Sequence, residues 1–193
     1  MIGVVLCGGQ STRMGSDKGL MQYKSLTLAE LVISKLAASI EQVVLSVNEQ
    51  QYGSYAKKFP ELVIVKDDLA LAVYGPLKGI LSVHLQYPAV DLLVLACDML
   101  SMHTDVLKYL INTSSVKEED AFVFQTNKYI EPLCAIYTAK GLTKICQLYN
   151  QGQLNKNSMH FILDSIQTCY LPVNKEWNNY FHNYNSPSDL SSL

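Results

Sequence analysis

The sequence predicts an α/β protein with a doubly wound, mostly parallel sheet and helices on both faces. Strand-like apolar runs alternate with segments of helical periodicity along the chain, which favours crossover connections between parallel strands. The run Leu92–Ala96 is apolar at every position, as expected of a central strand that is buried on both faces. The chain has 193 residues, 49% of them apolar, and we expect residues 1–193 to form a single domain.

Short apolar or β-branched runs, bounded by glycine or polar residues, predict the strands. These runs cover residues 2–6, 43–47, 62–65, 92–96, 121–124, 130–137 and 168–171. Pro132 has no N–H to donate to a neighbouring strand, and we therefore expect the strand over 130–137 to lie near an edge of the sheet.

Apolar side chains at helical spacing predict the helices, and capping signals indicate where some of them begin. We expect helices over residues 28–40, 50–58, 76–85, 104–111, 138–149 and 158–163, and a closing helix after Pro187. Thr27 and Glu30 have the spacing of a capping box. Gly75-Pro76 places a proline at the favoured first position of a helix.

The charge balance excludes several classes of protein. Fifteen cationic side chains face 17 acidic ones, for a net charge of −2, and Arg13 is the only arginine. This balance argues against a protein that binds nucleic acid along many phosphates. No apolar run approaches the ~18 residues of a membrane span, and the N-terminus lacks the basic leader of a signal peptide. The five scattered cysteines are typical of reduced thiols, and we therefore expect a cytoplasmic protein without membrane contact.

The loop after the first predicted strand, residues 7–18, carries the strongest signal of a site. It contains three glycines, several hydroxyl side chains, Arg13 and Lys18. Glycines allow backbone N–H groups to approach an anion closely, and the two cations could contact phosphate oxygens. The glycine spacing matches neither the P-loop nor the dinucleotide-binding fingerprint. The loop therefore predicts a nucleotide phosphate site, with a flexible loop of incidental charges as the alternative.

Polar side chains also follow the next predicted strands. Ligands of open parallel sheets bind beyond the carboxyl ends of the strands, where Asn48, Asp67 and Asp98 are expected. Asp98 suits Mg²⁺, which binds through one or two carboxylates plus substrate phosphates, and a helix cap is the alternative. Asp67 and its neighbour Asp68 could contact a base or ribose, or could lie in a solvated turn.

Five motifs together resemble one enzyme family. They are Leu6-Cys7-Gly8-Gly9-x-Ser11-x-Arg13-Met14-Gly15-x-Asp17-Lys18, Gly75-Pro76-Leu77-x-Gly79, Cys97-Asp98, Glu131-Pro132-Leu133 and Asn183-x-Asn185-Ser186-Pro187-x-Asp189-Leu190. In this order they resemble the molybdopterin nucleotidyltransferases, and most of all the molybdenum cofactor guanylyltransferases. The resemblance implies the Rossmann-like fold of the nucleotide-diphospho-sugar transferases.

The resemblance also implies a reaction and its residues. GMP would pass from GTP to the phosphate of molybdopterin, with Mg²⁺ as cofactor and pyrophosphate as the second product. The implied catalytic residues are Arg13, Lys18 and Asp98, with Asp98 as the metal ligand. The implied nucleotide-binding residues are Leu6, Cys7, Gly8, Gly9, Lys18, Asn48, Asp67 and Asp98. The implied acceptor-binding residues are Glu131, Asn183 and Asn185.

Two alternatives to this activity stay open at this point. One is a different small-molecule nucleotidyltransferase, such as a CTP-dependent molybdopterin cytidylyltransferase. The other is a nucleotide-binding regulator without catalysis. Under the guanylyltransferase hypothesis, transient contacts are expected with proteins that deliver molybdopterin and with proteins that take part in the maturation of molybdoenzymes.

Overall fold

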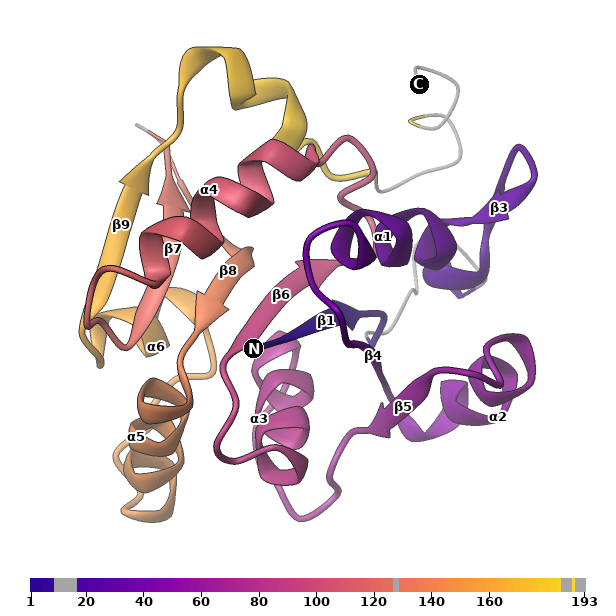
Figure 1. The fold of residues 1–193 in the computed structure, drawn as a ribbon. Coiled ribbons are helices and arrows are strands. Elements are labelled where there is room, and N and C mark those ends of the chain that lie inside the picture. The colour runs from indigo at the N-terminus through magenta and orange to yellow at the C-terminus, as the bar shows by residue number, and fades with distance from the viewer. Residues whose placement is uncertain (9–16, 127–128, 185–188, 190–193) are drawn as a thin grey trace.

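The computed structural model describes residues 1–8, 17–126, 129–184 and 189. Its main sheet has seven strands in the order β5-β4-β1-β6-β8-β7-β9 (Figure 1). The strands are β1 Ile2–Leu6, β4 Val43–Val47, β5 Val63–Lys66, β6 Leu92–Ala96, β7 Ala121–Gln125, β8 Ile130–Tyr137 and β9 Thr168–Pro172. Each lies within a residue or two of the run that predicted it, so the strand predictions are confirmed.

Strand direction divides the sheet into two parts. β5, β4, β1 and β6 are parallel to one another, and β1 lies between β4 and β6 with Val4 aligned to both Val44 and Val94. β8 runs antiparallel to β6 and β7, whereas β9 is parallel to β7. The prediction of a mostly parallel sheet is confirmed, with β8 as the strand that reverses direction.

The predicted edge position of β8 is wrong, because β8 is paired on both sides. The position of Pro132 explains how the sheet tolerates it. The pairing with β7 shifts register between Val123, opposite Ala135, and Phe124, opposite Glu131. The ladder with β6 ends at Cys134. Pro132 therefore lies in a bulge where neither neighbour needs its N–H, which is the other setting in which strands accommodate proline.

Helices cover both faces of the sheet, as predicted (Figure 1). The α-helices are α1 Leu28–Ala37, α2 Glu49–Lys58, α3 Pro76–Gln86, α4 Thr104–Ser114, α5 Ala139–Asn150 and α6 Met159–Asp164. Side chains of α1, α2 and α4 pack in the hydrophobic core on one face. Those of α3, α5 and α6 pack in a second core on the other face. Within the described ranges, no helix is long and apolar enough to cross a membrane.

Local sequence signals account for where several helices begin. Thr27 and Glu30 form the predicted capping box at the start of α1. Gly75 precedes α3 with a φ of 66°, a backbone conformation that disfavours residues with a Cβ, and Pro76 follows in the first turn. The closing helix expected after Pro187 falls largely outside the described residues.

Three short elements were not predicted. They are the 3₁₀ helices η1 Lys18–Leu20 and η2 Lys175–Phe181, and the hairpin of β2 Gln22–Tyr23 with β3 Leu26–Thr27. Elements of this length show too few turns or alternations for periodicity to reveal them. The first and second of these lie in or beside the candidate site described below.

A buried carboxylate, Asp120, joins three elements at the end of the sheet where β7 begins. Asp120 is 1% exposed, and its oxygens accept hydrogen bonds from Lys144 Nζ of α5 at 2.8 and 2.6 Å and from the Gln167 backbone N–H at 3.0 Å. These contacts join the start of β7 to α5 and to the residue before β9. Lys144 is 41% exposed, but the carboxylate is buried, and its removal would leave the Gln167 N–H without its acceptor, so these contacts should matter to stability.

We expect Asp120→Ala to lower the free energy of unfolding by about 2–4 kcal/mol, since the Gln167 N–H and the Lys144 ammonium both lose their acceptor. Glu49→Ala is the control, because the Glu49–Lys66 pair is about half exposed and should contribute less than about 1 kcal/mol. Denaturant unfolding of the three proteins measures both values. Equal losses in the two variants would contradict a special role for Asp120.

Candidate active site

The carboxyl ends of the four parallel strands meet at one edge of the sheet. Gly8 follows β1, Asn48 follows β4, Asp67 follows β5 and Asp98 follows β6. A Cβ placed on Gly8 would lie 3.8 Å from the Asn48 backbone nitrogen and 4.0 Å from Asp67 Oδ2. The structure therefore brings Gly8, Asn48 and Asp67 together, as the sequence predicts.

The sharpest polar contact at this edge joins two residues that are 80 positions apart. Lys18 Nζ lies 2.8 Å from Asp98 Oδ2, and both side chains are 18% exposed. Lys18 begins the 3₁₀ helix η1, which follows the glycine-rich loop. The predicted catalytic pair is thus adjacent and partly shielded from water. Arg13 and Gly9 lie outside the described residues.

The second oxygen of Asp98 bears on the predicted metal. Asp98 Oδ1 is buried and has no hydrogen-bond partner among the described residues. A buried carboxylate oxygen without a donor is costly unless a cation or another donor satisfies it. In the described part of the chain, no group of three His, Cys, Asp or Glu side chains could hold a metal alone. The residues fit a Mg²⁺ ion held by one carboxylate together with substrate phosphates.

Asp67 lies in a similarly dry environment. Its Oδ1 atom is buried without a hydrogen-bond partner among the described residues. Burial raises the pKa of the Asp67 carboxyl, and the positive charge of Lys78 partly opposes this shift. A carboxylate oxygen in this setting is available to accept from a ligand, such as a ribose hydroxyl or a base N–H.

The other predicted nucleotide contacts already have structural roles. Asn48 caps α2: its side chain accepts from Gln51 N at 3.0 Å, and its own N–H donates to Gln51 Oε1 at 3.1 Å. The backbone N–H groups of Cys7 and Gly8 both donate to Ser46 O. Leu6 O accepts from Cys97 N. A nucleotide could thus meet Cys7 and Gly8 through carbonyl oxygens, but not through these N–H groups without rearrangement.

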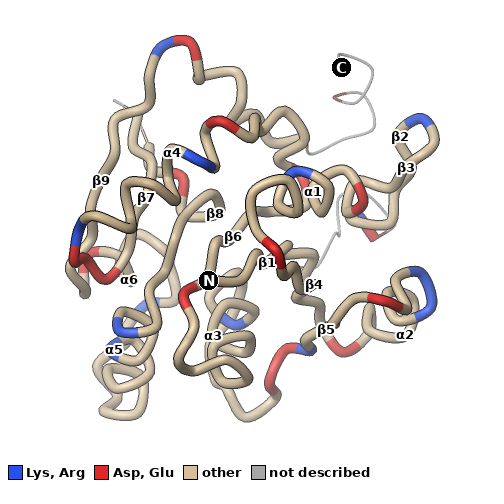
Figure 2. Tube along the Cα trace, viewed as in Figure 1, with Lys and Arg blue, Asp and Glu red and all other residues tan. Residues whose placement is uncertain are grey.

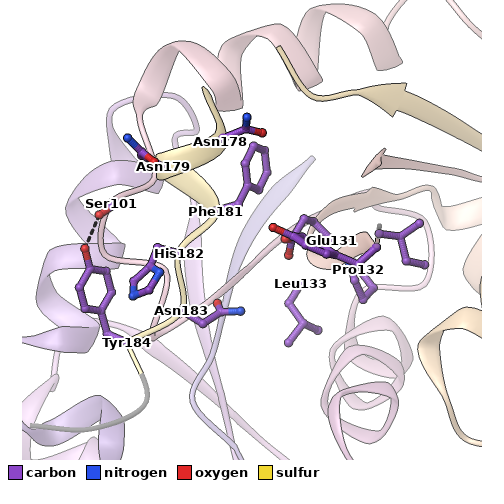
Figure 3. A pocket seen from close by; sticks show the side chains of 12 residues that line it. Ser101, Glu131, Pro132, Leu133, Asn178, Asn179, Phe181, His182, Asn183 and Tyr184 are labelled. Carbon is purple, nitrogen blue, oxygen red and sulfur yellow. Dashed lines mark hydrogen bonds between the residues drawn. The ribbon is translucent and has the colours of Figure 1, made fainter. Parts of the chain in front are cut away.

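A pocket of about 710 Å³ lies beside Asp98. It is lined by Ser101, by the segment 129–133 at the start of β8, by residues 178, 179 and 181 of η2, and by residues 182–184 that follow η2 (Figure 3). The Tyr184 backbone N–H donates to Asp98 O at 3.1 Å, which joins the pocket wall to Asp98. Ser101 Oγ and Tyr184 Oη share a hydrogen bond of 2.6 Å.

Two of the three predicted acceptor-binding residues line this pocket. Glu131 belongs to β8 and faces the segment that carries Asn183 (Figure 3). Burial, and then the negative charge of Asp98, raises the pKa of Glu131 to about 7. Asn185 lies outside the described residues. The structure thus brings together Glu131 and Asn183, which are 52 positions apart in the sequence.

An aromatic cluster holds the pocket wall against the sheet. Phe181 and Trp177 of η2 pack edge-to-face on Phe124 of β7, with ring centroids 5.1 and 6.2 Å apart. Tyr109 of α4 lies edge-on to Trp177 at 5.3 Å. Such pairs favour defined orientations. The cluster therefore gives a chain segment with little regular structure a fixed position next to the site.

Charge is thinly spread over the rest of the molecule. Figure 2 shows Lys, Asp and Glu scattered along the described trace without a continuous basic stripe. A long polyanion would need such a stripe, whereas one small anion needs only a few cations at one point. The charge distribution therefore favours a small ligand at the strand ends.

The comparisons with known proteins agree with this geometry. A family described as "MobA-like NTP transferase domain" matches residues 3–165. The chain belongs to this family. It is accordingly a nucleotidyltransferase, which confirms the resemblance seen in the motifs and the class of enzyme that they imply.

Relatives of this MobA-like chain carry related names. A molybdenum cofactor biosynthesis bifunctional protein of Synechocystis is 30% identical over 198 residues; the match spans 100% of this chain and 53% of that protein. A probable molybdenum cofactor guanylyltransferase of Flavobacterium johnsoniae is 29% identical, and the match spans 98% and 94%. The crystal structure of molybdopterin-guanine dinucleotide biosynthesis protein A from Archaeoglobus fulgidus has a TM-score of 0.81 at 24% identity, over 100% and 96% of the two chains. That likeness supports the fold.

The sequence analysis missed one group of polar residues in this MobA-like site. Asp17, Gln51 and Tyr55 form a partly buried hydrogen-bond cluster next to Lys18. Asp17 was visible in the first motif, but nothing in the sequence ties it to two residues of a later helix. The i, i+4 spacing of Gln51 and Tyr55 shows that they share one face of α2, without showing what that face contacts.

The raised pKa of Glu131 predicts a pH-dependent stability. In a buffer that contains EDTA, Glu131 should keep its proton in the folded state up to about pH 7, whereas the unfolded chain loses it near the ordinary pKa of 4.5. Between these values the unfolded state binds fewer protons, and the free energy of unfolding should fall by at most about 1.4 kcal/mol per pH unit. This loss is absent below pH 4.5 and complete above the raised pKa.

Glu131→Gln removes this titration, so the variant should gain stability relative to the wild type as the pH rises from 4 to 8. Denaturant unfolding at several pH values measures the difference, and Glu41→Gln at an exposed position is the matched control. A difference between Glu131→Gln and the wild type that stays constant over this range would contradict the raised pKa.

Proposed function

We propose that this chain transfers GMP from GTP to the phosphate of molybdopterin and releases pyrophosphate. The observation that carries the proposal is the Lys18–Asp98 pair, which lies between the nucleotide-side strand ends and the pocket that Glu131 and Asn183 line. The names of the relatives support the choice of GTP and of the molybdenum cofactor. The proposal takes residues 1–193 as one domain that acts in the cytoplasm.

The proposed reaction needs positioning and charge compensation more than proton transfer. An oxygen of the acceptor phosphate attacks the α-phosphorus of GTP and forms the new P–O bond. The bond between the α-phosphorus and the bridging oxygen to the β-phosphate breaks, and its electron pair leaves with pyrophosphate. Because the attacking oxygen is already anionic, no strong general base is required. The task of the protein is to bring two anions together and to offset the charge that develops.

Lys18 and Asp98 would divide this task. The Lys18 ammonium would neutralise oxygens of the triphosphate, and Arg13 is proposed to add a second cation from the glycine-rich loop. Asp98 would hold Mg²⁺ through its buried Oδ1. When bound, Mg²⁺ would supply Lewis-acid stabilisation and a template for the phosphates. Lys18 also offsets the charge of the Asp98 carboxylate, whose Oδ2 lies 2.8 Å from the lysine Nζ.

The pocket beside Asp98 would receive the acceptor. Its walls combine amide, hydroxyl and carboxyl side chains with the rings of Phe181 and Tyr184. Such a mixture suits a polar heterocycle, whose faces pack on apolar groups while its edges form hydrogen bonds. Proteins that deliver molybdopterin or receive the finished cofactor are proposed as transient partners.

We expect Lys18→Ala and Asp98→Asn each to lower turnover by roughly 10²–10³-fold, the scale for losing one preorganised electrostatic partner. Pyrophosphate release with GTP, Mg²⁺ and molybdopterin measures the effect. Lys58→Ala and Asp105→Asn are matched controls, because both side chains are exposed in surface ion pairs. Full turnover in folded Asp98→Asn would rule out Asp98 as the metal ligand.

Thermal unfolding with each of GTP, CTP, ATP and UTP tests the choice of nucleotide. With Mg²⁺ present, GTP at 100 times its dissociation constant should stabilise the fold by about 2.7 kcal/mol. EDTA should reduce this effect in the wild type more than in Asp98→Asn, where the proposed metal ligand is already lost. A response to CTP alone would overturn the guanylyl assignment and leave a cytidylyltransferase. GTP binding without pyrophosphate release would favour the non-catalytic regulator.

A further inference from the structure

The carboxylate of Asp17 is held by three donors from two parts of the chain. Its Oδ1 atom accepts from the Gly19 backbone N–H at 3.0 Å and from the Tyr55 hydroxyl at 2.8 Å. Its Oδ2 atom accepts from Gln51 Nε2 at 2.8 Å. Hydrogen bonds to an ionised acceptor are stronger than neutral ones. Asp17 and Gly19 are the residues on either side of Lys18, so these hydrogen bonds hold the backbone before and after Lys18.

Gln51 extends the same cluster to the end of β1. The Nε2 group that reaches Asp17 also donates to Cys7 O at 3.0 Å, and Gln51 Oε1 accepts from Asn48 N at 3.1 Å. One side chain of α2 thus contacts the segments after β1 and β4 and the residue before Lys18. These are the segments that the proposed function assigns to the nucleotide.

Tyr55 is the most deeply buried residue of the cluster. Its side chain is fully buried, and its ring packs against Phe59 at a centroid distance of 5.9 Å. Burial raises the pKa of the Tyr55 hydroxyl, and the nearby thiols and the Asp17 carboxylate raise it further, so the hydroxyl remains a donor to Asp17. A Cβ at position 19 would overlap the Tyr55 hydroxyl, which explains the glycine that follows Lys18.

We propose that Tyr55 and Gln51 are positioning residues for nucleotidyl transfer, which act through Asp17 to hold Lys18 against Asp98. The inference rests on the proposed function for its reaction, but its geometry does not depend on the base or the acceptor. Neither side chain needs to touch the substrate. Their effect is to limit the movement of η1, whose first residue carries the ammonium that faces Asp98.

The physical consequence is a loss of alignment rather than a loss of charge. Without the Tyr55 hydroxyl, Asp17 keeps its bonds to Gly19 and Gln51 but loses its contact with the fully buried side chain of α2. Displacements of about 1 Å in a positioned group can reduce turnover by as much as 10²-fold. We therefore expect Tyr55→Phe to lower kcat by about tenfold, with a change of less than about threefold in KM for the acceptor.

A double-mutant cycle between Tyr55→Phe and Lys18→Ala tests the inference. If Tyr55 acts through Lys18, Tyr55→Phe should cost about tenfold in the wild-type background and less than about twofold when Lys18 is already alanine. Tyr170→Phe is the matched control. Tyr170 lies on the edge strand β9, away from Lys18, and its hydroxyl also donates to a carboxylate, Asp164 Oδ1, at 3.3 Å. Tyr170→Phe should leave kcat unchanged in both backgrounds.

Three results would overturn the inference: unchanged kcat in Tyr55→Phe, an equal fractional loss with and without Lys18, or a loss that Tyr170→Phe shares. A lower melting temperature with normal kcat would assign Tyr55 to stability alone. If Tyr55→Phe fails to fold, Gln51→Leu takes its place in the same cycle.

The same four proteins separate a failure of this inference from a failure of the proposed function. If the wild type does not release pyrophosphate from any of the four nucleotides, the proposed function fails. In that case the double-mutant cycle uses binding in place of turnover. Thermal unfolding of the four proteins measures the dissociation constant of the Mg²⁺–nucleotide complex that the wild type binds. Additive effects of the two substitutions on that constant would overturn the inference as well.

Discussion

The site depends on the parallel alignment of β1 with both β4 and β6. Because the three strands run in the same direction and share one register, their carboxyl ends lie at one edge, where Gly8, Asn48 and Asp98 follow them. All residues of these strands are buried, so a shift in register would move polar side chains into the cores on either face. Hydrophobic packing thus determines where the polar groups of the site meet.

At this edge of the sheet, the ion pair between Lys18 and Asp98 lowers the free-energy cost of placing a carboxylate where it is largely shielded from water. The lysine satisfies one oxygen of Asp98 and leaves the buried Oδ1 atom without a described partner. This arrangement leaves one buried carboxylate oxygen that a cation or a hydrogen-bond donor could satisfy. The cluster of Asp17, Gln51 and Tyr55 holds the backbone on either side of the lysine, and the aromatic contacts of Phe181 and Trp177 hold the wall of the pocket beside Asp98.

Sequence patterns and the folded chain agree where the signal is local. Apolar runs located every strand of the main sheet, and the capping box at Thr27 located the start of α1, because burial and capping depend on neighbouring residues. Pro132 shows where such reasoning fails: its missing N–H was predictable, but the bulge that accommodates it arises from pairing with β7. Asn48 shows a second limit, since its position after a strand predicts a ligand contact, which stays a prediction, but does not reveal that its side chain caps α2.

By itself, the sequence determined the α/β class, the order along the chain of the main-sheet strands and the α-helices, the motif residues Lys18 and Asp98, and the strand-end residue Asp67. Periodicity and short spacings are written along the chain. Only the tertiary structure decided that β8 lies inside the sheet, that Lys18 meets Asp98, and that Glu131 and Asn183 share a pocket. It also revealed that Tyr55 supports Asp17. These contacts join residues tens of positions apart, and the free energy that brings them together comes from burial of the whole core rather than from any local pattern.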